Sequence, residues 1–201
     1  MLAATALLAG CGSDNTPTGD TASSVTQVAP TAPPSGVAWT SFQGMKIPTA
    51  DQGPHITTPV AAPHGFDHNG PGAALAAINA TVRMSVAADD QWATVGDQLL
   101  APGPARDNWT ITRVRLSITT PIATDAPKVC GYQMDDYTPQ KARVSIISRQ
   151  ADNSLTANAA TVVWSAEGDW QLQLPDASST ASPVTAIGAL PASMIALKGQ
   201  C

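Results

Sequence analysis

The stretch HGFDHNGPGAALAAINATVRM, residues 64–84, decides the fold because it opens the clearest helix pattern of the chain. Apolar side chains recur from there at spacings of three and four residues, on one side of a helix: Leu75, Ile78, Val82 and Val86. Pro71 suits the first helical turn, and a polar side chain at residues 67–69 can accept hydrogen bonds from the free backbone N–H groups. The pattern predicts a helix over residues 72–88.

The same stretch begins with two histidines four residues apart, His64 and His68. On a continuous helix this spacing would present both imidazoles to a metal ion, together with His55 and Asp67 from nearby. Glycines and a proline interrupt such a helix. We therefore favour capping and loop packing for these side chains over a metal site, and a His68 that faces a ligand is the second alternative.

Periodicity on the C-terminal side of this helix predicts further elements. A second helix is expected over residues 89–100, with Trp92, Val95 and Leu99 facing inward. From Trp109 onward the apolar period changes to two. This alternation predicts strands over residues 109–118, 128–134, 142–149, 157–164 and 170–174. Short turns separate the last three segments, which predicts hairpins.

Two helices followed by a run of strands are typical of an α+β domain. We expect N-terminal helices packed on one face of a curved antiparallel sheet of four to five strands. Residues 37–201 are expected to form one globular domain, because Trp39 belongs to the first stretch with aromatic residues. The chain length of 201 residues suits one core plus tails.

The N-terminal residues 1–11, MLAATALLAGC, are apolar up to a cysteine. Their last four residues, Leu8-Ala9-Gly10-Cys11, resemble the lipobox of bacterial lipoprotein signal peptides. The resemblance implies a signal peptide over residues 1–10 and a diacylglyceryl group on the thiol of Cys11. The alternative is a cysteine that occurs by chance in an ordinary apolar N-terminus. The run is shorter than the roughly 20 residues that a spanning helix needs.

No Lys or Arg precedes this run, so we expect the true start of the protein to lie upstream of Met1. After Cys11, residues 12–36 are rich in Ser, Thr, Pro and Gly, with Asp as their only charged residue type. Such a composition cannot bury enough apolar surface to fold, which predicts a disordered tether over residues 11–36 with a reach of about 25–30 Å. The expected location is the extracytoplasmic face of the cell membrane, held there by the lipid.

Export changes the expectation for the other two cysteines, Cys130 and Cys201. With Cys11 acylated, they are the remaining thiols in an oxidising compartment, where an even pair usually forms a bridge. We predict a disulfide between them that closes a loop of about 70 residues and stabilises the fold by roughly 3–5 kcal/mol. The alternative is two free thiols.

Charge and motifs exclude several functions. The chain has 15 acidic and 10 basic residues and a net charge of −5, so we expect no positive face for nucleic acid. It has no Gly-x-Ser-x-Gly elbow, Walker loop or dinucleotide-binding glycine pattern. We therefore expect neither an enzyme nor a bound cofactor or metal.

Two further groups of residues allow alternatives. Asp135-Asp136-Tyr137 lacks the spaced carboxylates of a calcium loop, so a solvated turn is favoured over a calcium site. Trp164 and Trp170 flank the turn of a predicted hairpin. We favour a core position for these indoles over an exposed platform that stacks on polysaccharide.

Glycine, proline and aromatic residues form spaced motifs along residues 37–201. They are Trp39-x4-Gly44-x3-Pro48, Gly53-Pro54, Gly65-Phe66-x-His68, Gly72-Ala73-Ala74-x-Ala76-Ala77-x-Asn79, Gly131-Tyr132 and Trp164-x3-Gly168-Asp169-Trp170-x-Leu172-x-Leu174-Pro175. In these motifs the chain resembles uncharacterised exported proteins of actinobacteria that are often encoded in integrative conjugative elements. The resemblance implies an envelope location and a conjugation context, and it transfers no catalytic residue.

The expected order of helices and curved sheet is also similar to the nuclear-transport-factor-two-like (cystatin-like) cone. That fold is shared by ketosteroid isomerases, ligand-binding proteins and an assembly subunit of type IV secretion systems. The leading hypothesis is a non-enzymatic envelope protein that contacts other proteins as an accessory to a conjugative or secretion apparatus.

Two other functions remain as alternatives. One is a small-molecule or glycan pocket in the cone, lined by His68, Trp92, Tyr132 and Trp164. The other is a cone-fold isomerase, whose carboxylate and tyrosine would come from the following candidates: Asp97, Asp136, Tyr132 and Tyr137.

Overall fold

The computed structural model describes residues 28–176, 178–179 and 181–201. Its elements follow one another along the chain in this order: β1 (Ala38–Phe42), β2 (Met45–Thr49), α1 (Gly70–Val86), α2 (Trp92–Leu99), α3 (Pro104–Arg113), β3 (Lys128–Thr138), β4 (Lys141–Arg149), β5 (Leu155–Trp164), β6 (Trp170–Gln173), β7 (Val184–Ile187) and β8 (Ile195–Ala196). The predicted signal peptide, Cys11 and most of the predicted tether lie outside the described residues. Ser35, at the end of that segment, is hydrogen-bonded to the domain through Asp51 and Gln52.

Two antiparallel sheets make up the β structure of the described chain. β1 and β2 form a hairpin, and the larger sheet has six strands in the order β6-β5-β4-β3-β8, with β7 also paired to β5. β6 pairs with the last part of β5 and β7 with its first part. Strands β3 to β6 are a simple meander, in which each strand pairs with the next.

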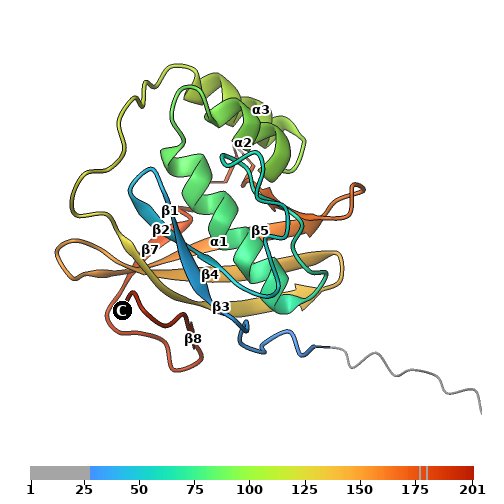
Figure 1. Ribbon diagram of the computed structural model, residues 1–201, viewed down its shortest axis with the longest axis vertical. Helices are drawn as coiled ribbons and strands as arrows, with labels where there is room; N and C mark the ends of the chain where they lie inside the picture. Colours follow the sequence, from blue (N-terminus) through green and yellow to red (C-terminus); the bar gives the residue numbers. More distant parts are fainter. Residues whose placement is uncertain (1–27, 177, 180) are drawn as a thin grey trace, which may run out of the picture.

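Helix α1 is the centre of the molecule. Figure 1 shows it running across one face of the large sheet, with the β1–β2 hairpin beside it. Its residues 70–80 are all buried, so the helix has no solvent-facing side over its first three turns. Alanine predominates there, and its small side chain lets the sheet and the hairpin both approach the helix closely. The helix therefore buries all its sides over these turns, and not only the single apolar stripe that the sequence predicted.

A polar ladder on α1 fastens the hairpin to the helix. The buried Asn79 amide donates to the Pro48 carbonyl oxygen at 3.1 Å, and its Oδ1 accepts from Arg83 Nε at 3.4 Å. Arg83 Nη1 donates to the Val60 carbonyl oxygen at 2.8 Å, and its guanidinium lies 4.4 Å from the centre of the Phe42 ring. Burial lowers the pKa of Arg83 to about 10, so the group remains charged at neutral pH.

The structure confirms the predicted central helix and the meander. α1 begins two residues before the predicted start, and Asn69 caps it by accepting a hydrogen bond from Gly72 N at 2.9 Å. Pro71 lies in the first turn, as expected. Four of the predicted strands appear as β3 to β6, and the second predicted helix appears as α2.

The predicted fold class is wrong in two respects. Its helices were expected at the N-terminus, on four to five strands, whereas in the described chain the β1–β2 hairpin precedes the helices and the main sheet has six strands. No strands were predicted for the hairpin, because its two strands have only five residues each and Pro48 interrupts the second. β7 is exposed along most of its length and β8 has two residues, so neither shows an apolar alternation.

The predicted strand over residues 109–118 is also wrong, because its first half belongs to helix α3. Pro104 begins this helix, and Trp109 packs edge-on against Trp92 of α2 with 6.1 Å between ring centres. Gly96 of α2 gives that indole its space, since a Cβ there would lie 2.7 Å from it. Tertiary packing of Trp109 overrides the alternating, β-branched local pattern.

Candidate functional site

The disulfide predicted between Cys130 and Cys201 is present, with 5.1 Å between the two Cα atoms. It fixes the C-terminal residue beside β3, where β8 pairs with that strand. Gly131 makes this approach feasible, because a Cβ on it would lie 2.4 Å from the Ile195 carbonyl oxygen. Leu197 N adds a hydrogen bond to the Cys130 carbonyl oxygen at 2.9 Å.

The histidines proposed as weak metal candidates make three separate sets of contacts. His55 Nε2 lies 2.9 Å from Asp67 Oδ1, whereas His64 Nδ1 lies 3.1 Å from the Ala62 carbonyl oxygen. The His68 ring nitrogen Nε2 contacts the Pro139 carbonyl oxygen. Among the described residues, no group of three or more His, Cys, Asp or Glu side chains could hold a metal ion.

Two of the four residues predicted to line a ligand pocket come together. The His68 ring stacks on Trp164 with 3.8 Å between ring centres and 13° between ring planes. Trp170 lies edge-on to both rings, and Tyr137 lies beside Trp170. Trp170 is buried and Trp164 is half-buried, so these indoles anchor the β5–β6 hairpin to the start of α1.

The other two predicted pocket residues lie elsewhere. Trp92 packs on Trp109, with the Arg113 guanidinium 5.7 Å from its ring centre. Tyr132 is fully buried in the core, and burial raises the pKa of its phenol far above the ordinary value. Its hydroxyl has no hydrogen-bond partner among the described residues. The face of the sheet where a cone pocket was expected is filled by α1.

The predicted acid–base residues are also distributed over different elements. Asp97 lies on α2, whereas Asp136 and Tyr137 lie on β3. The prediction of a turn at residues 135–137 is wrong, because β3 continues through them to Thr138. An irregularity in the β3–β4 register next to Asp136 interrupts the regular alternation there. Asp135 is occupied by a hydrogen bond from the Ser145 hydroxyl at 2.7 Å.

Asp169 joins two of the motifs that carry the family resemblance. Its carboxylate accepts hydrogen bonds from the backbone N–H groups of Gly65 and Phe66, the latter at 3.0 Å. The neighbouring Trp170 indole N–H donates to the Asp67 carbonyl oxygen at 3.0 Å. The Gly-Phe-x-His and Gly-Asp-Trp motifs thus form one structural junction, and their residue types are explained by the fold.

A rim pocket of about 680 Å³ lies next to this junction, between the loop before α1, helices α2 and α3 and the β5–β6 turn. Charged and polar side chains contribute to its lining: His64, Asp97, Arg106, Ser165 and Glu167. Ile56 and Pro102 also line it, so the pocket combines apolar surface with hydrogen-bonding groups, as the faces and hydroxyl groups of a sugar ring require.

Three exposed apolar side chains lie within six residues at the end of α3 and directly after it, and we call them the α3 face: Ile111, Val114 and Leu116. These side chains are 57%, 66% and 56% exposed, and the first two are three residues apart on one side of the helix. Large contiguous apolar surfaces mark protein contact sites, so three exposed apolar side chains this close in sequence are a candidate for one. Sequence analysis missed this surface because it predicted a strand there.

A buried arginine holds the α3 face in place. Arg113, 3% exposed, donates to the Ala87 and Leu116 carbonyl oxygens, each at 2.7 Å, and to Asp89 Oδ1 at 3.2 Å. Asp89 also accepts from the Ser117 hydroxyl and from Ile118 N. These bonds, led by the one from Ile118 N, lower the pKa of Asp89. The segment after α3 is therefore fixed to the end of α1.

Among the described residues, no helix has both the length and the hydropathy that crossing a membrane requires.

Comparison with known proteins gives one match. A family model described as a domain of unknown function, DUF8175, matches residues 6–192. No curated protein and no solved structure matches the chain. The matched segment includes Cys11 and nearly all of the folded domain. The chain therefore belongs to this family, the domain of unknown function DUF8175.

Proposed function

We propose that the chain is a lipid-anchored protein of the extracytoplasmic face of the cell membrane, and that it acts by binding another envelope protein. The Cys130–Cys201 disulfide is the observation that carries this proposal. Disulfides persist in oxidising compartments, which supports export. The bond also leaves Cys11, in its lipobox-like sequence, as the remaining cysteine of the chain. The family match begins at residue 6, so this sequence belongs to the segment that the family shares.

The partner in this proposal is a component of a conjugative or secretion apparatus. The resemblance to exported proteins of integrative conjugative elements suggests that context, and the α3 face is the surface that suits the contact. Arg115, Ser117 and other polar side chains border its apolar residues, as at the rim of many protein interfaces. The Arg113–Asp89 network keeps the face in one conformation, which reduces the entropy lost on binding.

The location is tested on the protein purified from its native host. We expect it to enter the detergent phase on phase partitioning, and its mass to exceed that of the amino acids by the lipid. Cys11→Ser should move the protein to the aqueous phase and remove the added mass. A wild-type chain with the bare polypeptide mass, found in the aqueous phase, would overturn the proposed anchor.

The contact is tested by placing a photo-crosslinking residue at Val114 in the native host. We expect a discrete adduct with a component of the translocation apparatus, and we expect Ile111→Asp to remove it. A crosslinker at Val60, which is 71% exposed and distant from α3 in sequence, is the matched control. Equal adducts from both positions, or none from Val114, would contradict a partner at the α3 face.

The rim pocket of about 680 Å³ supports a second candidate function, the binding of a small glycan. Soluble cell-wall oligosaccharides, titrated by calorimetry, should then bind with one site per chain. Arg106→Ala and Glu167→Gln should each weaken that binding. Absence of heat with the wild-type protein would remove this candidate and leave the protein-contact proposal intact.

A further inference from the structure

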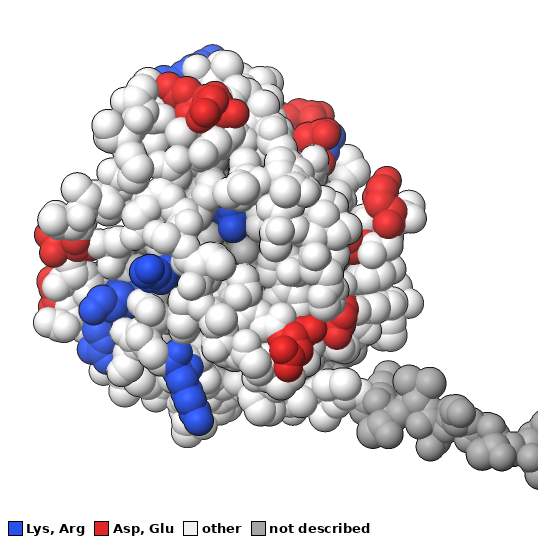
Figure 2. All heavy atoms as spheres, in the orientation of Figure 1, with Lys and Arg blue, Asp and Glu red and all other residues white. Residues whose placement is uncertain are grey.

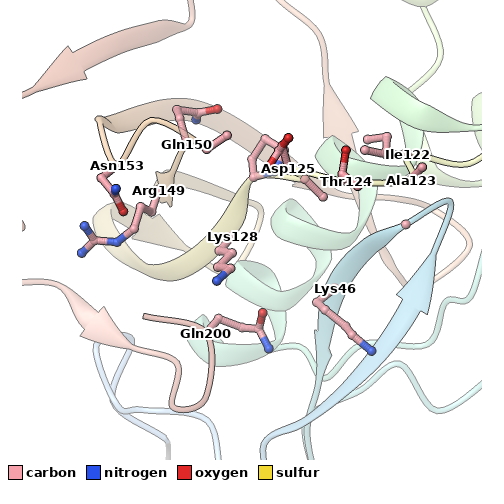
Figure 3. A pocket seen from close by; sticks show the side chains of 14 residues that line it. Lys46, Ile122, Ala123, Thr124, Asp125, Lys128, Arg149, Gln150, Asn153 and Gln200 are labelled. Atoms are coloured by element: carbon pink, nitrogen blue, oxygen red, sulfur yellow. The ribbon is translucent and has the colours of Figure 1, made fainter.

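A second pocket, of about 510 Å³, lies between residues 122–127, the segment before β3, and the place where the start of β3, the end of β4, β2 and the C-terminal residues meet. We call it the basic pocket. The residues on which its chemistry depends are three cations and three amides: Lys46, Lys128, Arg149, Gln150, Asn153 and Gln200. Figure 3 shows Lys128 beside Gln200 and between Arg149 and Lys46, whose charged ends point away from each other. Its volume falls in the range of small-ligand sites.

The strand register places two of these cations directly opposite each other. Lys128 at the start of β3 and Arg149 at the end of β4 are partners in the antiparallel pairing, so their side chains share one face of the sheet. Like charges in directly opposed positions destabilise a sheet. An anion bound between the two cations would relieve this repulsion.

No ion pair among the described residues compensates this repulsion directly. Their ion pairs join His55 to Asp67 and Arg113 to Asp89, and neither involves a cation of the basic pocket. Asp125 contributes to the pocket lining without pairing to any of them. Figure 2 shows most of the visible Lys and Arg side chains at the lower left of the face, with acidic side chains at the left edge beside them. This concentration arises in a chain whose net charge is −5.

Three independent elements hold the pocket in shape. Lys46 lies between the buried residues Met45 and Ile47 of β2, so strand alternation directs it away from the core. Gln200 is covalently followed by Cys201, which the disulfide binds to β3. Lys128 and Arg149 are held by the β3–β4 register. The cations therefore come from parts of the chain that are far apart in sequence.

We infer that the basic pocket binds the phosphate group of a small anionic ligand. Lys and Arg side chains supply charge-assisted donors for the phosphate oxygens, and the long Lys side chains can turn inward to reach one anion. The amides of Gln150, Asn153 and Gln200 supply neutral donors for the same group. This inference is independent of the lipid anchor and of the α3 face.

Calorimetry on the full chain, carried as Cys11→Ser to keep it free of lipid, tests the inference. Inorganic phosphate and pyrophosphate are the probes, and acetate at matched ionic strength is the comparison anion. We expect saturable binding of one phosphate probe per chain and no saturable binding of acetate. Lys128→Gln and Arg149→Gln should each raise Kd about tenfold or more, as loss of a charged hydrogen bond does.

Arg143→Gln is the matched control, because Arg143 is an exposed arginine on the same strand and does not line the pocket. It should leave Kd unchanged. In thermal unfolding, phosphate should raise the midpoint of the wild-type and Arg143→Gln chains, and it should raise that of the pocket variants less at the same concentration. Without phosphate, Lys128→Gln should unfold at the wild-type temperature or above it, which shows that the variant is folded. Absence of saturable binding, or equal weakening by Arg143→Gln, would overturn the inference.

Vesicles then distinguish two sources of the phosphate group. If phosphatidylglycerol vesicles bind the wild-type chain and inorganic phosphate displaces it from them, a lipid headgroup is the source. If the chain binds the free phosphate probes and sediments with neither phosphatidylglycerol nor phosphatidylcholine vesicles, the ligand is soluble. Vesicle binding that Lys128→Gln does not weaken would count against the basic pocket.

Discussion

At the scale of single residues, one carboxylate organises the junction between the start of α1 and the β5–β6 hairpin. Asp169 accepts hydrogen bonds from Gly65 N, Phe66 N and Trp170 N, and no other side chain of the described residues takes its place at these N–H groups. Its role was not visible in the sequence, where Asp169 was simply part of a turn. This contact explains why the motif residues at 65–68 and 168–170 occur together in the chain.

We predict that Asp169→Ala destabilises the protein by about 2–4 kcal/mol, because it leaves several partly buried N–H groups without an acceptor. Urea unfolding followed by far-UV circular dichroism measures the change. Glu167→Ala, an exposed residue of the same turn, is the control and should alter the free energy of unfolding by less than about 0.5 kcal/mol. Equal losses in the two variants would show that the junction does not depend on this carboxylate.

Asp89 determines a pH dependence at the same scale. Hydrogen bonds from Ile118 N, the Ser117 hydroxyl and Arg113 lower its pKa in the folded protein. A carboxyl whose folded pKa lies below its unfolded value stabilises the fold above the unfolded pKa, and this stabilisation is lost as the pH falls through the folded pKa. The loss therefore lies below about pH 4, the ordinary range of Asp.

We expect Asp89→Asn to flatten the decline of unfolding free energy below about pH 4, relative to the wild-type chain. Guanidinium unfolding at a series of pH values between about 2.5 and 6 measures it. Asp90→Asn, at the adjacent exposed position, is the control and should keep the wild-type slope. Identical slopes for all three chains would contradict the role of Asp89.

At the scale of elements, β8 illustrates how a strand of two residues can be formed. It has no apolar pattern of its own, and its pairing relies on the close approach of Gly131 to Ile195. We predict that Gly131→Ala separates β8 from β3 and lowers the free energy of unfolding by about 1–3 kcal/mol, since backbone atoms cannot yield to the added methyl group.

Hydrogen exchange measures this separation directly, because the amide of Leu197 should lose its protection when its bond to the Cys130 carbonyl oxygen opens. Gly188→Ala is the control, since a Cβ there meets open space. Retained protection at Leu197 in Gly131→Ala would mean that β8 does not need the glycine.

Helix α3 shows the limit of local pattern at this scale. Alternation of apolar and charged residues from Trp109 onward predicted a strand, yet the chain forms a helix over Pro104–Arg113. In this helix the buried Arg113 donates to the Ala87 carbonyl oxygen, directly after α1, and the indole of Trp109 packs on Trp92 of α2. By contrast, the predicted strands at residues 142–149 and 157–164 lie in the sheet interior, and alternate residues are buried over 142–146 and 160–162.

At the scale of the whole molecule, the disulfide connects the C-terminus to the sheet across 71 positions. We predict that Cys201→Ser lowers the free energy of unfolding by about 3–5 kcal/mol. A reducing agent should lower the stability of the wild-type chain to that of the variant and leave the variant unchanged. Because Gln200 lines the basic pocket, phosphate affinity should fall with reduction as well; an unchanged Kd would show that the C-terminal residues are dispensable there.

Charge is the second property of the whole molecule. The net value of −5 led to the expectation of no positive face, yet the fold brings Lys46, Lys128 and Arg149 to one pocket. Net charge averages over the surface, whereas a ligand experiences the local charges within about one Debye length, roughly 8–10 Å. The expectation that nucleic acid is not a partner stays a prediction.

Local pattern was sufficient for the central helix, the β3–β6 meander and the pairing of Cys130 with Cys201. Their signals are the periodicity of long segments and an even pair of thiols in a chain that we expect to be exported. Both can be read from the sequence without knowing which residues become neighbours in the fold. The β1–β2 hairpin, α3, β7, β8 and the basic pocket depended on tertiary structure. These elements are short or exposed, and the residues of the pocket are far apart in sequence. Both are therefore determined by contacts that exist only once the chain has folded.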